Sequence, residues 1–176
     1  FGFGLSYTTF SHQLMKVDVN GTSITSQAET TNTGITYSGK EVLQLYIAKP
    51  FGKLSHEKRS LTAFAKTKLL APGESELLTL TFNLCDISSY DEELSAWILE
   101  KGEYGLFLGN SSRSLEPIAV VILDENVMTE KCVSICPLPL KLNEIKADLP
   151  IVVYSENLPR FFIKSRVKNS SVTIFQ

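Results

Sequence analysis

Hydrophobic and polar positions alternate along most of the first 123 residues with a period of two, which is typical of β-strands. The clearest case follows the polar turn at Ser38, where Leu43, Leu45 and Ile47 fall on one face of an extended segment. Gln44 is the single polar residue of the run from 42 to 47. We interpret this run as the central strand of a β-sandwich, with its inner face fully buried.

Residues 10–19 change parity halfway, which predicts a β-bulge near Met15 or Lys16. Asn20 and Gly21 then predict a tight hairpin turn, because both residues tolerate positive φ. The following strand carries small or polar residues on the face that would be inside. This composition favours an edge position or a poorly packed corner for residues 24–31. The face consists of Ile24, Ser26, Ala28 and Thr30.

Further short extended segments follow, and turn residues separate them at intervals of roughly ten residues. Pro72 and Gly73 occupy the central positions of a predicted type II turn. In the next strand Leu78, Leu80 and Phe82 point inward. Seven or so short strands without a long helical pattern are typical of an immunoglobulin-like β-sandwich. The later strands are expected at 61–70, 78–82, 96–99, 104–109 and 118–123.

The chain changes character at residue 124, so we expect a sandwich domain at 1–123 and a linker with a C-terminal extension at 124–176. Prolines interrupt residues 132–139, and residues 140–145 could form at most a helical turn. Residues 161–168 alternate again, with basic side chains on one face, as in a strand with a solvated side.

Charge and composition exclude several classes of function. The chain has 43% hydrophobic residues, enough for a sizeable core, and a net charge of −2. Its basic residues are dispersed, which argues against nucleic acid as a partner. No apolar run reaches the ~20 residues of a membrane span. We expect neither nucleic-acid nor membrane partners, and no cofactor.

Cysteines and glycosylation triplets leave the cellular compartment open. Three cysteines cannot all pair, so unpaired thiols are favoured, although a bridge between Cys132 and Cys136 or one that involves Cys85 stays open. Asn20, Asn110 and Asn169 begin N-glycosylation triplets, which a chain rich in Ser and Thr also produces by chance. The cytoplasm is slightly favoured over secretion.

The first seven residues alternate aromatic residues with glycine and indicate a piece of a longer polypeptide. Phe1, Phe3 and Tyr7 supply ring surface that has to be covered. Two interpretations stay open: the rings pack against the base of their own domain, or they dock on a preceding domain.

Catalytic chemistry has few candidates in this sequence. The dense acidic cluster is 91–93, with Asp86 nearby, and we interpret these carboxylates as solvated or capping groups. The histidines are His12, expected to be half-buried and satisfied in a strand, and His56, expected in an exposed loop; neither suggests a triad. Cys132 and Cys136 have no histidine close in sequence, so no zinc site is expected.

Exposed aromatic rings could instead form a sugar-binding platform. We expect Trp97 to pack in the core because Ile98 and Leu99 follow it, and Tyr46 to lie against the second sheet or a neighbouring domain. The remaining candidates are Tyr37, Phe51 and Tyr90.

Seven short motifs occur in order along the first 123 residues: FGFGLSYT at 1–8, TNTG at 31–34, GKEVLQLYI at 39–47, LAPGES at 70–75, YDEE at 90–93, WILEKGEY at 97–104 and GNSSRSL at 109–115. In this order and at this spacing they resemble a known module, the fibronectin type III-like domain of glycoside hydrolase family 3. The resemblance covers about residues 1–123.

The resemblance implies a β-sandwich that accompanies a barrel and an α/β sandwich domain in enzymes, mostly β-glucosidases, that hydrolyse terminal β-linked sugars. In some members the module precedes the barrel, and the tail from 124 resembles the connection in that arrangement. The chain departs from the family at Ser26, Ala28 and Thr30, where the family usually has valines. The family's catalytic acid and nucleophile motifs are absent from this sequence.

These observations favour a non-catalytic structural module that supports and orients the catalytic domains of the same polypeptide. The alternative is an independent carbohydrate-binding or adhesion module. A hydrolase in its own right is least favoured, because the sequence lacks a plausible pair of catalytic carboxylates.

Overall fold

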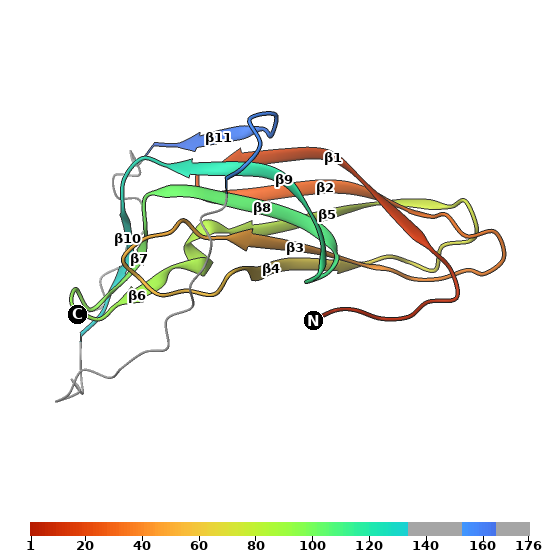
Figure 1. The fold of residues 1–176 in the computed structure, drawn as a ribbon, viewed down its shortest axis with the longest axis horizontal. Coiled ribbons are helices and arrows are strands. Elements are labelled where there is room, and N and C mark those ends of the chain that lie inside the picture. Colours follow the sequence, from red (N-terminus) through yellow and green to blue (C-terminus); the bar gives the residue numbers. More distant parts are fainter. Residues whose placement is uncertain (134–152, 165–176) are drawn as a thin grey trace.

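Two β-sheets face each other and form a sandwich in the computed structural model, which describes residues 1–133 and 153–164 (Figure 1). The first sheet has the order β1-β2-β5, and the second has the order β11-β9-β8-β3-β4. The strands of the first sheet are β1 (Phe10–Asn20), β2 (Ser23–Asn32) and β5 (Ser75–Asn83). Those of the second are β3 (Val42–Ala48), β4 (Ser60–Lys66), β8 (Gly102–Ser111), β9 (Ser114–Leu123) and β11 (Arg160–Ile163).

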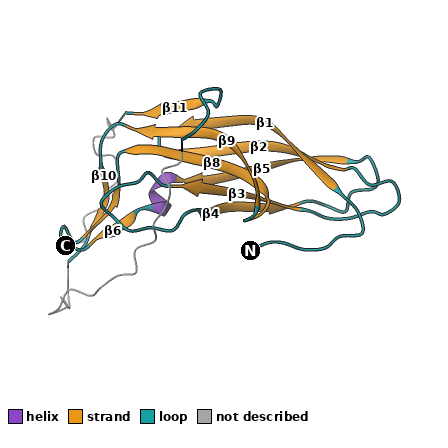
Figure 2. Ribbon diagram, viewed as in Figure 1, coloured by secondary structure: helices purple, strands orange, loops and turns teal. Residues whose placement is uncertain are grey.

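A small third sheet, β10-β7-β6, lies at one end of the sandwich, at the left of Figure 1. Its strands are β6 (Ser89–Asp91), β7 (Ala96–Leu99) and β10 (Val127–Lys131). The 3-10 turn η1 (Leu84–Ile87) is the only helical element of the described residues, and Figure 2 shows it between β5 and β6. The predicted all-β sandwich is confirmed. No helix within residues 1–133 and 153–164 is long and apolar enough to cross a membrane.

The strand predicted to be central, β3, pairs with β4 on one side and β8 on the other. Leu43, Leu45 and Ile47 are completely buried in the core between the two sheets. The inward alternation of β5 is also confirmed, since Leu78, Leu80 and Phe82 lie in the same core.

The first hairpin contains the predicted bulge, where the register shifts between Leu14 and Lys16. Its turn lies one residue later than expected. Asn20 is still in β1 and pairs with Ser23, so the two turn residues are Gly21 and Thr22. Only the first of them has positive φ, +59° at Gly21, which is the requirement of a type II′ turn.

The prediction of an edge or poorly packed position for β2 is wrong. β2 lies between β1 and β5, and Ser26, Ala28 and Thr30 are buried. The small residues pair directly with large ones, because Ser26 lies opposite Leu80 and Ala28 opposite Leu78. The bulk that β2 lacks is therefore supplied by its neighbour, and the interior is filled.

The outer face of the five-stranded sheet is also covered. Tyr46 does not meet the second sheet; it lies in a separate buried cluster with Phe107, Val120 and Tyr154, which belongs to the C-terminal segment. The ring centroids of Phe107 and Tyr154 are 6.3 Å apart. A Cβ at Gly105 would lie 2.3 Å from the Tyr154 ring, so glycine makes room for that ring.

The C-terminal segment also adds a strand to the sheet. β11 pairs in parallel with β9, and Arg160 donates to Glu103 on β8 at 2.6 Å. The predicted alternation is confirmed at Phe161 and Ile163, which face the core, and at Phe162, which is exposed.

Several sequence predictions lie outside the described residues. These are the fate of Cys136, the helical turn at 140–145, the alternation at 166–168 and the glycosylation triplet at Asn169. No disulfide joins Cys85 and Cys132, which are both half-buried.

We predict that Tyr154→Ala lowers the free energy of unfolding of the 176-residue chain by about 2–5 kcal/mol, because it removes a buried ring and leaves a cavity over Gly105. Urea unfolding followed by circular dichroism measures the loss. Phe162→Ala, which truncates an exposed ring on β11, is the control and should change stability by less than about 0.5 kcal/mol. Equal losses in the two variants would contradict this account of the C-terminal segment.

Candidate functional site

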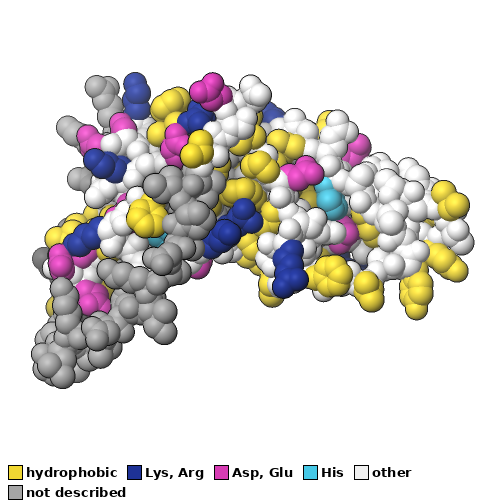
Figure 3. All heavy atoms as spheres, in the orientation of Figure 1, with side chains coloured by type: hydrophobic (Ala, Val, Ile, Leu, Met, Phe, Trp, Pro, Cys, Tyr) yellow, Lys and Arg dark blue, Asp and Glu magenta, His cyan; other side chains and the backbone are white. Residues whose placement is uncertain are grey.

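Six large apolar side chains gather outside the core on the N-terminal segment and the loop after β2. Their exposed fractions run from 56% for Tyr37 to 95% for Leu5. Hydrophobic atoms gather at the right end of the space-filling view, where these loops lie (Figures 1 and 3). We call this set the N-terminal apolar surface: Phe1, Phe3, Leu5, Tyr7, Ile35 and Tyr37.

The first residues of this surface are anchored to the five-stranded sheet. The Ser112 amide donates to the Phe1 carbonyl at 3.0 Å. Gly2 has φ +76°, and a Cβ there would lie 2.3 Å from the Gln44 side chain. Gln44 is itself fixed, because its amide donates to the Asn110 carbonyl at 2.8 Å. Glycine is therefore required at position 2 for conformation and for space.

A buried asparagine, Asn32, positions the other loops that carry the surface. Its side-chain amide donates to the carbonyls of Tyr37 and Leu70, at 3.0 and 2.9 Å. Its side-chain oxygen accepts from the Thr8 hydroxyl and from the Gly34 amide. One fully buried side chain thus joins the N-terminal segment, the loop after β2 and the segment before β5.

The backbone of Asn32 completes this network. Its amide donates to the Glu74 carbonyl at 3.0 Å, and its carbonyl accepts from the Gly73 amide at 2.9 Å. Gly73 has φ +78°, as the predicted type II turn requires. All the hydrogen-bonding groups of Asn32 are used, so the loops are held in one arrangement.

Sequence analysis identified part of the N-terminal apolar surface. Tyr7 lies beside Tyr37, with ring centroids 6.0 Å apart, although the two were predicted for different roles. Leu5 and Ile35 were missed. Their signal is an apolar side chain flanked by glycine and turn residues, outside any strand alternation.

The predicted ligand-contact aromatics are not brought together. Tyr37 lies in the N-terminal apolar surface, Phe51 projects from the loop between β3 and β4, and Tyr90 is on β6. The prediction that Trp97 packs in the core is wrong, because 41% of its side chain is exposed. Its neighbours along β7, Ala96 and Ile98, point inward instead, and alternation turns the indole outward.

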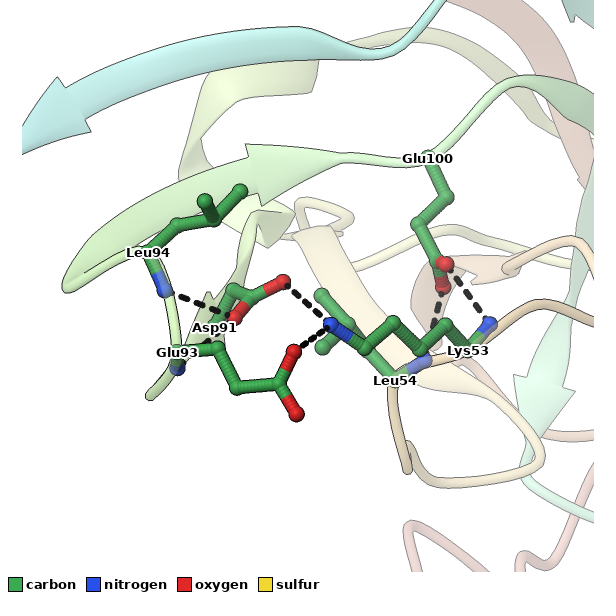
Figure 4. Close-up of polar contacts among 6 residues, drawn as sticks. All are labelled: Lys53, Leu54, Asp91, Glu93, Leu94 and Glu100. Carbon is green, nitrogen blue, oxygen red and sulfur yellow. Dashed lines mark hydrogen bonds and ion pairs between the residues drawn. The ribbon is translucent and has the colours of Figure 1, made fainter.

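The acidic cluster forms hydrogen bonds and ion pairs that join the loop between β3 and β4 to the β6–β7 hairpin (Figure 4). One oxygen of Asp91 accepts from the amides of Glu93 and Leu94, at 2.9 and 3.0 Å. Lys53 bridges to Asp91 at 3.3 Å and to Glu93 at 2.6 Å. The Glu100 carboxylate accepts from the backbone amides of Lys53 and Leu54. The capping role expected for this cluster is confirmed at Asp91.

The electrostatics at Asp91 oppose general acid catalysis. The Leu94 amide, and after it the Lys53 ammonium, hold the pKa of Asp91 below its ordinary value. A glycosidase acid needs the opposite, a carboxyl group with a raised pKa. A nearby cavity of about 10 Å³, lined by His56, Ser89 and Glu100, holds at most about one water.

The two histidines do not form a catalytic site. His56 is half-buried, and its ring nitrogens each lie 2.9 Å from a carbonyl oxygen, of Glu57 and of Pro50. His12 is half-buried, as predicted, but only its Nδ1 has a partner among the described residues, Thr30 at 3.2 Å. Burial lowers the pKa of His12. No cluster of three metal-ligating side chains occurs in residues 1–133 and 153–164.

The fold and the sequence can be compared with known proteins. Residues 41–112 match the family model of the fibronectin type III-like domain. Beta-glucosidase A of Butyrivibrio fibrisolvens is 38% identical over 150 residues, covering 74% of this chain and 18% of that protein. A beta-glucosidase of Ruminococcus albus is 38% identical over 138 residues, covering 74% of this chain and 14% of that protein.

Solved structures give the same result. A beta-glucosidase from Paenibacillus barengoltzii superposes with a TM-score of 0.73 at 42% identity, over 76% of this chain and 16% of that chain. Beta-glucosidase 3B from Thermotoga neapolitana gives 0.67 at 39% identity, over 74% and 18%.

The sandwich is therefore a fibronectin type III-like domain. It is the domain found in the β-glucosidases of glycoside hydrolase family 3, as the sequence motifs indicated. The chain spans less than a fifth of the length of the relatives named above, 18% and 14%.

We predict that Asn32→Asp lowers the free energy of unfolding by about 2–5 kcal/mol at pH 7, because it replaces two buried donors by an acceptor facing carbonyl oxygens. Asn83→Asp is the matched control. Asn83 caps η1 only as an acceptor, from the Cys85 amide at 2.9 Å, and aspartate does this equally well. Urea unfolding measures both, and similar stabilities for the two variants would contradict the role of Asn32.

We predict that Asp91→Ala lowers the free energy of unfolding by about 1–3 kcal/mol at pH 7, because two backbone amides lose a charged acceptor. The folded pKa of Asp91 is depressed. Its charge therefore stabilises the fold fully above the unfolded pKa of about 3.9 and stops doing so as the pH falls through the folded value. The difference between the two proteins should shrink below pH 4 in urea titrations, and a constant difference from pH 7 to pH 3 would contradict it.

Proposed function

We propose that this chain is a non-catalytic structural module of a family 3 glycoside hydrolase of the β-glucosidase type. In this role the N-terminal apolar surface supports and orients the catalytic barrel and the α/β sandwich domain of the same polypeptide. The observation that carries the proposal is a set of exposed rings and aliphatic side chains on loops fixed by the buried Asn32 network.

Exposed apolar groups held in one arrangement favour binding, since little conformational entropy is lost when a partner covers them. None of the six members is charged, which is the composition of the centre of a protein interface. A monomer rarely exposes so many large apolar side chains together without a partner.

The comparisons support the identity of the partner. The relatives are β-glucosidases several times longer than this chain, and the matched part is a small fraction of each. The carboxylates described above cap backbone amides or pair with Lys53, which fits a module that leaves the chemistry to other domains.

We predict that the double variant Tyr7→Ser, Tyr37→Ser lowers the melting temperature of the intact parent enzyme, because each ring that leaves an interface costs about 1–3 kcal/mol. The same variant of the 176-residue chain should unfold within about 1 kcal/mol of the unchanged chain, since both rings are exposed there. Differential scanning calorimetry of both proteins makes the comparison.

Phe64→Ser, which removes an exposed ring from β4, is the control in both proteins. Below its melting temperature the parent should keep its turnover number, because the proposal assigns this surface to docking and not to the reaction. An unchanged melting temperature of the parent enzyme in the double variant would overturn the proposed docking role.

A further inference from the structure

Three side chains form a row across the small sheet at the other end of the molecule. The register pairs Tyr90 on β6 with Trp97 on β7, and Trp97 with Glu130 on β10. Residues that pair directly across antiparallel strands project from the same face of the sheet. Tyr90, Trp97 and Glu130 therefore lie side by side on one face.

The row is exposed and ordered. The exposed fractions are 38% for Tyr90 and 41% for Trp97, and Glu130 is exposed as well. The two rings meet edge to face, with centroids 5.5 Å apart and an interplanar angle of 62°. A bulge between Met128 and Glu130 and a hydrogen bond from Thr129 to the Trp97 carbonyl, at 3.2 Å, fix β10 beside the indole.

The chemistry of this row suits a sugar ring. A β-linked glucose unit carries its hydroxyls and linkages equatorially, so its two faces are C–H surfaces and its rim is polar. An aromatic face covers such a C–H surface, and the rim hydroxyls donate to a carboxylate. Because the two rings meet edge to face at 62°, they do not form one flat platform. The Trp97 indole supplies the face that covers the C–H surface, the Tyr90 ring borders it, and Glu130 supplies the acceptor on the other side.

We propose that the Tyr90–Trp97–Glu130 row binds the glucose units of a β-linked gluco-oligosaccharide. The site is remote from the N-terminal apolar surface, because the loops of that surface lie at the opposite end of the sandwich (Figure 1). The module could therefore dock at one end and hold a sugar chain at the other. This inference concerns the isolated chain and does not depend on the structural role proposed above.

Charge favours a sugar over a protein partner at this row. Glu130 stands beside the indole, Lys131 follows it, and the Lys53–Asp91 bridge ends at the residue after Tyr90. The centres of protein interfaces are depleted of charged residues, whereas carboxylates and lysines commonly accept and donate hydrogen bonds at the rim of a sugar. The N-terminal apolar surface, which has no charged member, shows the contrasting composition.

The single tryptophan of the chain makes the test specific to this site. Cellohexaose is titrated into the 176-residue chain while the emission of Trp97 is recorded, and isothermal calorimetry gives an independent affinity. We expect a saturable change in emission. Maltohexaose, an α-linked glucose chain of the same length, should bind more weakly, because its axial linkages interrupt the flat C–H face that the indole covers.

Variants separate the row from other surfaces. Tyr90→Ala should weaken the calorimetric affinity for cellohexaose by about tenfold, and Trp97→Ala should abolish detectable binding. Glu130→Gln should weaken binding and keep the emission change. Phe51→Ala and Phe64→Ala, which truncate exposed rings elsewhere, should bind like the unchanged chain. Circular dichroism confirms that each variant is folded.

Two results would overturn the proposal. One is the absence of a saturable emission change and of calorimetric heat at millimolar cellohexaose. The other is equal binding by the Trp97→Ala and Phe64→Ala variants. The row would instead be a contact between domains if sugar did not change the emission of Trp97 in the isolated chain, and this emission differed between the isolated chain and the intact parent enzyme.

Discussion

The side chain of Asn32 is the constraint on which one whole end of the sandwich depends. It is buried, and its four side-chain hydrogen bonds reach three separate segments, so no water can replace a lost partner cheaply. The N-terminal segment, the loop after β2 and the segment before β5 also meet through backbone bonds, from Thr33 to Thr9 and between Gly39 and Leu70. The Asn32 side chain bonds to all three of them. With this network they form a single rigid edge, and the exposed apolar groups acquire a defined spatial pattern.

The opposite end uses charge for the same purpose. Glu100 holds two consecutive backbone amides of the loop between β3 and β4, and Lys53 ties that loop to the β6–β7 hairpin. These contacts are partly exposed and individually weak, whereas the Asn32 network is buried. The two ends therefore differ in kind: the N-terminal apolar surface has no charged side chain, whereas the other end combines aromatic rings with charges.

Much of the sandwich was predictable because strand alternation is a local signal. The bulge in β1, the central position of β3 and the inward residues of β5 all follow from neighbours in sequence. The position of β2 did not follow, because the bulk that fills its buried face comes from Leu78 and Leu80 on β5. Trp97 is a different case: burial was expected because Ile98 and Leu99 follow it, whereas its parity between Ala96 and Ile98, a local signal, turns it outward.

The site was harder to predict than the fold. The rings of residues 1–7 could be identified from the sequence. That Tyr37 lies beside Tyr7 could not, because the Asn32 side chain holds the loop that carries Tyr37. The Tyr90–Trp97–Glu130 row depends on β10, which the sequence presents as part of a linker. Both sites depend on contacts between separate segments, so the pattern within any one segment does not predict them.

The parallel pairing of β11 has a consequence for solubility. β9 contains the run from Ile118 to Leu123, which is apolar, rich in β-branched residues and free of charge and proline. Such a strand at an open sheet edge is a template for pairing with other chains and for aggregation. β11 occupies that edge from Val120 to Leu123, and the charged Lys164 follows its last residue. By covering this edge, the C-terminal segment blocks pairing with other chains there. A fragment that ends after β10 would leave the apolar edge of β9 exposed.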